Sequence, residues 1–466
     1  MMKLKSLTIG TFVMLVFNLM EVKGNEKNTN CSYRDSATEH LREVLKALTV
    51  SDYFMFGVPN ALTISYNGGP KHPFNDQSDC KDITGSHPAF IESDFEWYDH
   101  PDFKEWDIEA MKKAYKAGAV VGYCYHLRSP RDYEYYAYKN EKPINDFHLV
   151  KDILSNPDRK TNPNLNWYLT LLDTLVIPVF KELGFPLIYR PFHEMTGNWF
   201  WWGTSTCTPE EFVKIYRLTV DYLRDNGIRN VLYAWAPDKS SDMQFYPGDD
   251  YVDVIGYDGY DVGIAEWHPI DLFIDNLKKL TDYAYQHNKI AAITEVGLYN
   301  LTKYPQYWTK NVFEPIYKNS LHKKIAWIMT WYNADWNHDQ KGISYIPYKG
   351  IENKDGGIQA INDFIEFYNL PYTIFLNDIP PMYFNKNNSE LFVFPKNLKL
   401  KLNEEIVLIG GSYNNWFKDT KKWISSNSSI VEIDTTGKLK ALKKGKVKIT
   451  MIFPDGRKAF SEVIVE

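Results

Sequence analysis

The sequence predicts an α/β protein, a (β/α)8 TIM barrel followed by a small C-terminal all-β sandwich. Eight apolar runs alternate with helix-period stretches from about residue 36 to residue 378, as expected of a barrel. From about residue 389 the chain changes to short strands separated by turn dipeptides such as Asp455-Gly456. The alternative, an open doubly wound sheet, is weakened because no GxGxxG motif follows any of the runs.

The eight apolar runs are continuous rather than alternating, which is typical of parallel strands that are buried on both faces. Each is short enough to be one strand and is followed by polar or glycine-containing sequence. They cover Tyr53–Gly57, Pro88–Asp94, Ala119–Leu127, Phe185–Glu194, Asn230–Pro237, Val252–Asp258, Lys289–Gly297 and Ile325–Tyr332.

Helical patterns lie between these runs, and the clearest of them spans Pro209–Asn226. Thr208 is its expected N-cap, and Glu211 three residues later completes a capping box. In a second pattern, Trp167–Leu183, Pro178 is expected to kink the helix because it has no backbone N–H. The remaining patterns cover Trp106–Lys116, Leu272–Gln286 and Ile358–Tyr368.

The predicted sandwich occupies residues 391–466 and follows a linker rich in Pro and Asn. It carries 14 Lys and Arg against 8 Asp and Glu, whereas the whole chain has a formal net charge of -6. Its expected strands are Leu391–Phe394, Leu398–Leu402, Ile406–Gly410, Ile430–Asp434, Val447–Phe453 and Ala459–Val465.

The first 24 residues have the pattern of a secretory signal peptide. Lys3 and Lys5 precede an apolar run that ends near Met20 and is too short for a typical membrane span. We therefore expect cleavage near residue 24 and a mature protein that is secreted or held at the cell surface, without a membrane span. An uncleaved anchor is the alternative.

Composition restricts the function further. Hydrophobic residues make up 44% and charged residues 24% of the 466 residues, which excludes a mostly disordered chain. The acidic balance argues against binding of nucleic acid by the main body. Aromatic residues reach 16%, and such side chains provide flat platforms for ligands with apolar faces.

Motifs for metal and cofactor chemistry are lacking. The four cysteines fit no CxxC motif, although an exported chain permits one or two disulfides. His193-Glu194 would begin an HExxH zinc motif, but Gly197 stands where the second His is required. There is no GxSxG nucleophile elbow. We expect no metal and no cofactor.

Two glutamates mark a candidate catalytic pair. Glu194 ends the fourth apolar run and Glu295 lies near the end of the seventh, and the carboxyl ends of barrel strands carry the catalytic groups. Burying a carboxylate there is costly without a purpose. One acid and one nucleophile, ~5–5.5 Å apart, are what a retaining glycosidase requires. The alternative for either residue alone is a salt-bridged strand end.

Aromatic residues follow Glu194 closely, and four of them lie within Trp199–Trp202. Exposed rings in one loop are poor for solubility unless a ligand covers them, and a pyranose can stack its C–H face on such a ring. The alternative is a core plug beneath the loop, above all for Trp201 and Trp202. Trp331, at the end of the eighth run, is either a second platform or a core residue.

The run from Arg190 to Gly203 (RPFHEMTGNWFWWG) closely resembles the acid/base signature of glycoside hydrolase family 26, best known for endo-β-1,4-mannanases. The resemblance extends over roughly residues 36–378. Other matching motifs are Tyr125-His126-Leu127 on the third strand, the Asp253, Asp258 and Tyr260 spacing on the sixth, and Thr294-Glu295-Val296-Gly297 on the seventh.

The resemblance implies a role for each matching residue. Glu194 is implied to be the general acid/base and Glu295 the nucleophile. His193 and Tyr260 are implied to hydrogen-bond around the nucleophile and the sugar, and Trp199 and Trp331 to be stacking platforms. Substrate contacts are implied for His126, Arg190 and Asp258.

The C-terminal stretch resembles a bacterial Ig-like domain of group 2, through segments around Trp423, Val431 and Gly437. Such modules usually act as spacers or attachment domains. Its positive charge, together with Trp416, leaves open the binding of a polysaccharide or a cell wall.

The sequence therefore predicts a signal peptide (1–24), a barrel domain (36–378) and an Ig-like domain (391–466). The expected function is that of a secreted, monomeric, retaining endo-β-1,4-mannanase acting on mannan, galactomannan or glucomannan. Two alternatives remain: the same mechanism on mixed-linkage β-glucan or β-xylan, and a catalytically silent carbohydrate-binding protein.

Overall fold

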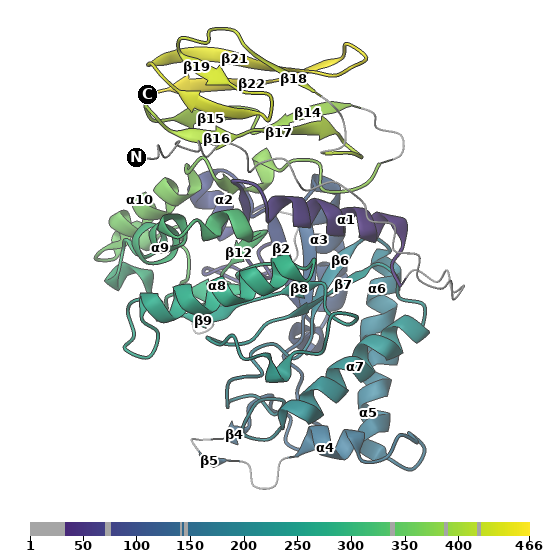
Figure 1. Ribbon diagram of the computed structural model, residues 1–466. Coiled ribbons are helices and arrows are strands. Elements are labelled where there is room, and N and C mark those ends of the chain that lie inside the picture. The colour runs from purple at the N-terminus through teal and green to yellow at the C-terminus, as the bar shows by residue number, and fades with distance from the viewer. Residues whose placement is uncertain are drawn as a thin grey trace, which may run out of the picture. The chain divides into compact units, whose positions relative to one another are not determined.

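The computed structural model describes residues 33–69, 76–139, 142–143, 148–335, 341–385, 390–416 and 421–466. The predicted signal peptide and Cys31 lie outside these residues. None of the described helices is long and apolar enough to cross a membrane. Figure 1 shows the arrangement of the helices and strands.

The predicted barrel is present, and its strands are parallel. Their order is β10-β8-β7-β6-β3-β2-β1-β12, and a parallel bridge between Ile293 and Ile328 joins the two ends of that series. The strands are β1 (Phe54–Gly57), β2 (Phe90–Asp94), β3 (Val120–Cys124), β6 (Leu187–Arg190), β7 (Val231–Trp235), β8 (Val254–Ile255), β10 (Ile290–Ala291) and β12 (Trp327–Met329).

Each of the eight apolar runs contains one of these strands, and the sixth and seventh are extended by a second short strand. These are β9 (Asp258–Tyr260) and β11 (Glu295–Gly297), which pair in parallel beyond β8 and β10. Their register places Asp258 beside Glu295 at the carboxyl end of the barrel. A further strand, β13 (Thr373–Ile374), pairs with β1, and β4 (Tyr138–Lys139) pairs with β5 (Lys142–Pro143).

The predicted helices form with small shifts of their ends. The capping box of Thr208 and Glu211 is complete at the start of α7. At Pro178 the helix does not simply kink: a π-helical segment, Leu172–Val176, precedes α6, because the proline lacks an N–H and its ring crowds the preceding turn. The helices are α1 (Ser36–Leu48), α2 (Asp79–Thr84), α3 (Phe103–Ala117), α4 (Leu149–Leu154), α5 (Pro163–Leu171), α6 (Ile177–Leu183), α7 (Pro209–Asp225), α8 (Ile270–Gln286), α9 (Glu314–Lys318) and α10 (Gly357–Tyr368).

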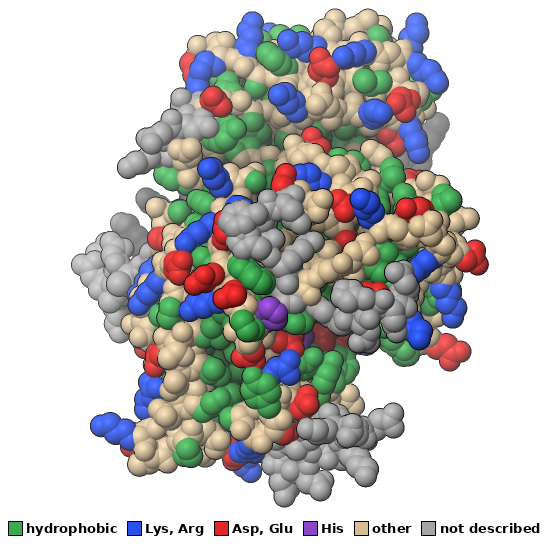
Figure 2. Space-filling model, turned by 180° about the vertical axis from the view of Figure 1, so that it is seen from behind, with side chains coloured by type: hydrophobic (Ala, Val, Ile, Leu, Met, Phe, Trp, Pro, Cys, Tyr) green, Lys and Arg blue, Asp and Glu red, His purple; other side chains and the backbone are tan. Residues whose placement is uncertain are grey.

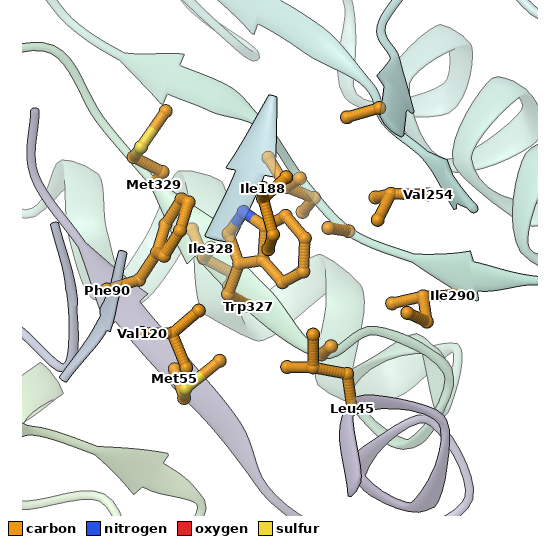
Figure 3. Packing of buried hydrophobic residues seen from close by; sticks show 14 of the residues in the cluster. Leu45, Met55, Phe90, Val120, Ile188, Val254, Ile290, Trp327, Ile328 and Met329 are labelled. Carbon is orange, nitrogen blue, oxygen red and sulfur yellow. The ribbon is translucent and has the colours of Figure 1, made fainter. Parts of the chain in front are cut away.

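The core of the barrel is apolar and closed at its amino end. Met55, Val120, Ile188 and Phe90 lie around the fully buried indole of Trp327 (Figure 3). Helix α1 covers the amino ends of the strands: Arg42 donates to the Asn288 carbonyl just before β10. The carboxyl end is therefore the one available for a site.

The C-terminal domain is a sandwich with more strands than predicted. Its sheets are β15-β22-β21-β18, β16-β20-β19 and β14-β17, and the pairing of β15 with β22 is parallel. The predicted run Ile406–Gly410 is divided between two strands. The strands are β14 (Leu391–Phe394), β15 (Asn397–Leu400), β16 (Glu405–Val407), β17 (Ile409–Ser412), β18 (Lys422–Ser425), β19 (Val431–Ile433), β20 (Lys438–Ala441), β21 (Gly445–Ile452) and β22 (Lys458–Val465).

Buried and exposed residues alternate along β22 and through most of β21, and their charged side chains all point outward. Lysine and arginine side chains are accordingly spread over the face of this domain that Figure 2 shows. Trp416 is not among the exposed groups, since it is 4% exposed and its indole N–H donates to the Pro381 carbonyl at 3.0 Å. The Trp416 ring therefore belongs to the core and cannot contribute to the polysaccharide or cell-wall binding that the sequence leaves open.

Candidate active site

The carboxyl end of the barrel holds a buried ionic cluster centred on Arg190, the last residue of β6. The guanidinium donates to both oxygens of Glu92 (3.2 and 2.7 Å), to Asp258 (3.0 Å) and to Glu295 (2.6 Å). Its side chain is 1% exposed. Burial alone would lower the pKa of Arg190, but the three carboxylates outweigh it and hold the pKa well above its ordinary value. The cation is therefore permanent.

Glu295, the first residue of β11, receives two donors. Its Oε1 accepts from Arg190 at 2.6 Å, and its Oε2 accepts from the hydroxyl of Tyr260. Both donors fix the orientation of the carboxyl group at the mouth of the barrel. The structure thus brings together Glu295, Tyr260 and Arg190, three residues singled out from the sequence.

Asp258 lies next to Glu295 but is turned inward. It is fully buried, with one oxygen on Arg190 and the other accepting from the Thr294 hydroxyl at 2.6 Å. Arg190 is enclosed in the same way. Both side chains are too deeply buried for the expected contacts with substrate hydroxyls. Their hydrogen bonds instead fix the position of Glu295.

Glu194 follows β6 in a strained turn rather than within the strand. Its φ is 57° and that of Phe192 is 53°, a left-handed conformation that costs energy in residues other than glycine. The Glu194 N–H is fixed by the Ala236 carbonyl at 2.7 Å. Gly197 is required nearby, because a Cβ there would lie 2.5 Å from the Trp199 ring.

The Glu194 side chain is in an environment that favours its protonated form. Burial and the carboxylates of Glu295 and Asp238 raise its pKa to about 8, and the indole N–H of Trp199, which donates at 2.7 Å, opposes only part of this rise. The site therefore contains one carboxyl group held neutral at pH 7 and another, Glu295, held by a cation and a hydroxyl.

His126 and His193 form a second polar group beside the carboxylates. The His126 Nδ1 lies 2.5 Å from Asp94, and its Nε2 lies 3.2 Å from the Nε2 of His193. Burial lowers the pKa of His126, but Asp94 outweighs it and raises the pKa to about 9. Burial, Arg190 and His126 lower the pKa of His193. A protonated His126 therefore donates to a neutral His193.

The aromatic residues after Glu194 divide into two classes. Trp201 and Trp202 are fully buried, and their indole N–H groups donate to the carbonyls of Leu127 and His193. These two form the core plug considered as the alternative. Trp199 and Trp331 are partly exposed, and Trp331 lies edge-on to His126 with 5.2 Å between the ring centroids.

Sequence reasoning missed several members of the site. Glu92 and Asp94 lie in the second apolar run, and two acidic residues inside a continuous apolar strand were the signal that could have found them. Asp238 and Lys239 follow β7, and Tyr345 packs on Tyr260 with 5.4 Å between the rings. These three residues lie in loops, and the sequence pattern of a loop does not predict where its side chains lie in the folded protein.

One group among the described residues has the ligand types for a metal: Asp94, Cys124 and His126, whose ligand atoms lie within 4.8 Å of one another. The group fits a metal poorly. The Nδ1 of His126 and the Asp94 carboxylate are already hydrogen-bonded to each other, and burial raises the pKa of the Cys124 thiol, which keeps it protonated. Cys80, Cys124 and Cys207 are all free and buried.

A (β/α)8 barrel that holds a neutral and a donor-stabilised carboxyl group at its carboxyl end defines a protein of the glycoside hydrolase class. The sequence model of glycosyl hydrolase family 26 matches residues 35–348. This is about two thirds of the chain, and the chain belongs to that family. The model of the bacterial Ig-like domain of group 2 matches residues 412–463.

Two mannan endo-1,4-β-mannosidases illustrate the similarity in sequence. The protein of Bifidobacterium adolescentis is 32% identical over 212 residues, which are 40% of this chain and 21% of that protein. The protein of Bacillus subtilis is 24% identical over 275 residues, 55% of this chain and 69% of that protein. The first match thus spans about a fifth of the relative's length.

Solved structures agree with this assignment. A GH26 β-mannanase from Bacteroides ovatus is 25% identical with a TM-score of 0.64, over 76% of this chain and 98% of that chain. A modular endo-β-1,4-mannanase from Cellulomonas fimi has a TM-score of 0.64 over 93% of this chain and 98% of that chain, but at 22% identity it shows the fold alone.

Proposed function

We propose that this chain is a retaining endo-β-1,4-mannanase in which Glu194 is the general acid/base and Glu295 the nucleophile. The observation that carries the proposal is the contrast between the two carboxyl groups. Glu194 has a pKa of about 8 because it is buried beside other carboxylates, whereas Glu295 accepts from Arg190 and Tyr260. The names of the related mannanases supply the substrate.

In the first step, the Glu295 carboxylate attacks the anomeric carbon and Glu194 gives its proton to the departing glycosidic oxygen. The bond to the leaving sugar breaks as the ester to Glu295 forms. That ester carries no charge, so one cause of the raised pKa of Glu194 disappears. In the second step, ionised Glu194 takes a proton from water, and the resulting hydroxide releases the sugar from Glu295 with net retention.

The surrounding residues divide into those that touch the sugar and those that position the glutamates. We assign Trp199, Trp331 and His126 to the sugar, since the two tryptophan rings are partly exposed and His126 lies against Trp331. His193 is buried and lies against His126, so it acts on the sugar through that residue. Tyr260 donates to Glu295 and orients it. Arg190 and Asp258 are positioning residues, because both are buried within the ionic cluster.

A β-glucan is the second candidate substrate. Endoglucanase H of Acetivibrio thermocellus is 28% identical over 180 residues, 34% of this chain and 18% of that protein. The same two-carboxylate mechanism applies to a β-glucosidic bond, so the substrate class rests on the shape of the cleft rather than on the catalytic pair.

We further propose that residues 1–24 direct export, that residues 36–378 form the catalytic domain and that residues 391–466 are an Ig-like appendage. The mature protein is then a secreted or surface-held monomer. Amino-terminal sequencing of the protein collected from the medium tests the cleavage, and an intact Met1 would contradict it.

Product analysis tests the activity. The mature protein is incubated with linear mannan, galactomannan, glucomannan, mixed-linkage β-glucan and β-xylan. Internal cleavage of the mannans, with the first-formed products in the β-configuration by NMR, is expected. Release from glucan or xylan alone would overturn the substrate but keep the mechanism. Release from no polymer would favour the carbohydrate-binding alternative.

A further inference from the structure

An exposed tryptophan lies on a rigid base close to the catalytic cluster. Trp267, in the loop between β9 and α8, is 53% exposed, and its ring stacks on His268 at an interplanar angle of 10°. His268 is fully buried and held between the Tyr257 hydroxyl (2.7 Å) and the Tyr260 carbonyl (2.6 Å). The base of the exposed ring is thus tied to the residue that contacts Glu295.

A lysine links this ring to the acid/base. The ammonium of Lys239 lies 5.1 Å from the centroid of the Trp199 ring and 4.9 Å from that of Trp267. The side chain of Lys239 forms an ion pair with Asp238, and its backbone N–H donates to the backbone carbonyl of Asp258 at 2.7 Å. Trp199 in turn donates to Glu194. A continuous surface therefore runs from Glu194 to Trp267.

The strand order places this surface on one side of the barrel. Trp199, Lys239 and Trp267 follow β6, β7 and β9, and β6, β7 and β8 are neighbours in the sheet. His126 follows β3, on the other side of β6 in the strand order, and the ring of Trp331 packs on His126 with 5.2 Å between centroids. The surface from Trp199 to Trp267 and the pair of His126 and Trp331 therefore lie on different sides of β6.

We infer that Trp267 and Lys239 form a further sugar-binding subsite, which holds the leaving-group portion of a neutral β-linked polysaccharide. This inference rests on the proposed function. The acid gives its proton to the oxygen that leaves, so the surface that continues from Glu194 through Trp199 is on the leaving-group side. The indole offers a face for the C–H groups of a pyranose, and the ammonium donates to its hydroxyls.

The test compares substrates with and without a leaving sugar. An aryl β-mannotrioside fills the opposite side and releases only a phenol, whereas mannopentaose needs sugars on both sides. We expect Trp267→Ala to lower kcat/KM for mannopentaose about tenfold, the value of one aromatic stacking contact, and to leave that for the aryl substrate within about twofold.

Trp267→Phe and Tyr285→Ala are the controls. The phenylalanine keeps a stacking face and is expected to retain most of the activity, and it serves if the alanine variant does not fold. Tyr285 is 71% exposed on α8, and its replacement is expected to change neither substrate. Equal losses on both substrates, or no loss on mannopentaose, would overturn the subsite. Failure of the unsubstituted protein to cleave either substrate would refute the proposed function before any variant is compared.

Discussion

The barrel and the sandwich handle charge in opposite ways. The barrel buries an ionic cluster of Arg190, Glu92, Asp258 and Glu295 at its open end, each at most 4% exposed. The buried polar side chain of the sandwich, among its described residues, is Ser461, and its charged side chains lie on the outside. Both domains bury apolar cores, so stability alone does not call for buried charge.

This difference in burial indicates that the barrel accepts the desolvation cost of buried charges in order to hold reactive groups. A buried ion pair does not stabilise a fold more than apolar packing does, because its desolvation offsets the attraction. In the sandwich, Glu405 pairs with Lys438 at the surface, where such pairs contribute little. In the barrel, the same kind of group has a pKa displaced to about 8 at Glu194. The candidate active site is therefore distinguished by the burial of its charged groups and not by their number.

Removing a barrel carboxylate should have the largest effect. Glu295→Ala and Glu194→Ala are each expected to lower turnover at least about 10³-fold, since the first removes the nucleophile and the second the proton donor. Azide should restore activity to the Glu295 variant, because it can occupy the place of the lost carboxylate. The matched sandwich variant, Glu432→Ala, should be fully active in the same rate assay.

Near-normal turnover of either barrel variant would remove that residue from the catalytic pair. Azide rescue of the Glu194 variant with inverted product, in place of the Glu295 variant, would exchange the two roles.

The next largest effect is expected from the centre of the ionic cluster. Arg190→Met leaves Glu92, Asp258 and Glu295 buried without their cation, which should reduce the free energy of unfolding by about 3–5 kcal/mol. Urea denaturation measures this change. Lys440→Met on the exposed face of β20 is the control and should leave the midpoint unchanged. A stable Arg190 variant would mean that the cluster is hydrated rather than dry.

The pH profile gives a third test of the contrast. The acid must be protonated to act, and the pKa of Glu194 is raised to about 8. Activity should therefore be present below that value, and kcat/KM should fall about tenfold per pH unit above it. Glu432→Ala should keep the same profile. A fall that begins near pH 5 would show that the Glu194 carboxyl has an ordinary pKa in solution.

Much of the barrel could be predicted because its signals are local. Each strand was a continuous apolar run, and the two glutamates were noticeable because a carboxylate at the end of such a run is costly to bury. Arg190 was placed among the substrate-binding residues, but its burial depends on Glu92 from a strand about 100 residues earlier, which no local pattern reveals. The same holds for Lys239 and Trp267, which meet only in the folded chain.

Trp416 shows the opposite failure. The positive charge of the C-terminal domain, together with Trp416, leaves open the binding of a polysaccharide or a cell wall, but the Trp416 ring packs against Phe392 with 5.3 Å between centroids. Sandwiches need large rings in a thin core, and composition does not separate that use from ligand binding.

The smallest effect is expected on the outer face of the sandwich. Lys422 and Lys458, on β18 and β22, are exposed, and reversing both to Glu changes only surface charge. The melting temperature should move by about 1 °C or less, and kcat/KM for soluble oligosaccharides should not change. The reason is distance from any desolvated group, since exposed charges are screened by water and salt. A loss of activity confined to insoluble mannan would instead show that this lysine-rich face helps to bind the polymer. The barrel would then carry the catalytic groups and the sandwich would attach the protein to its substrate.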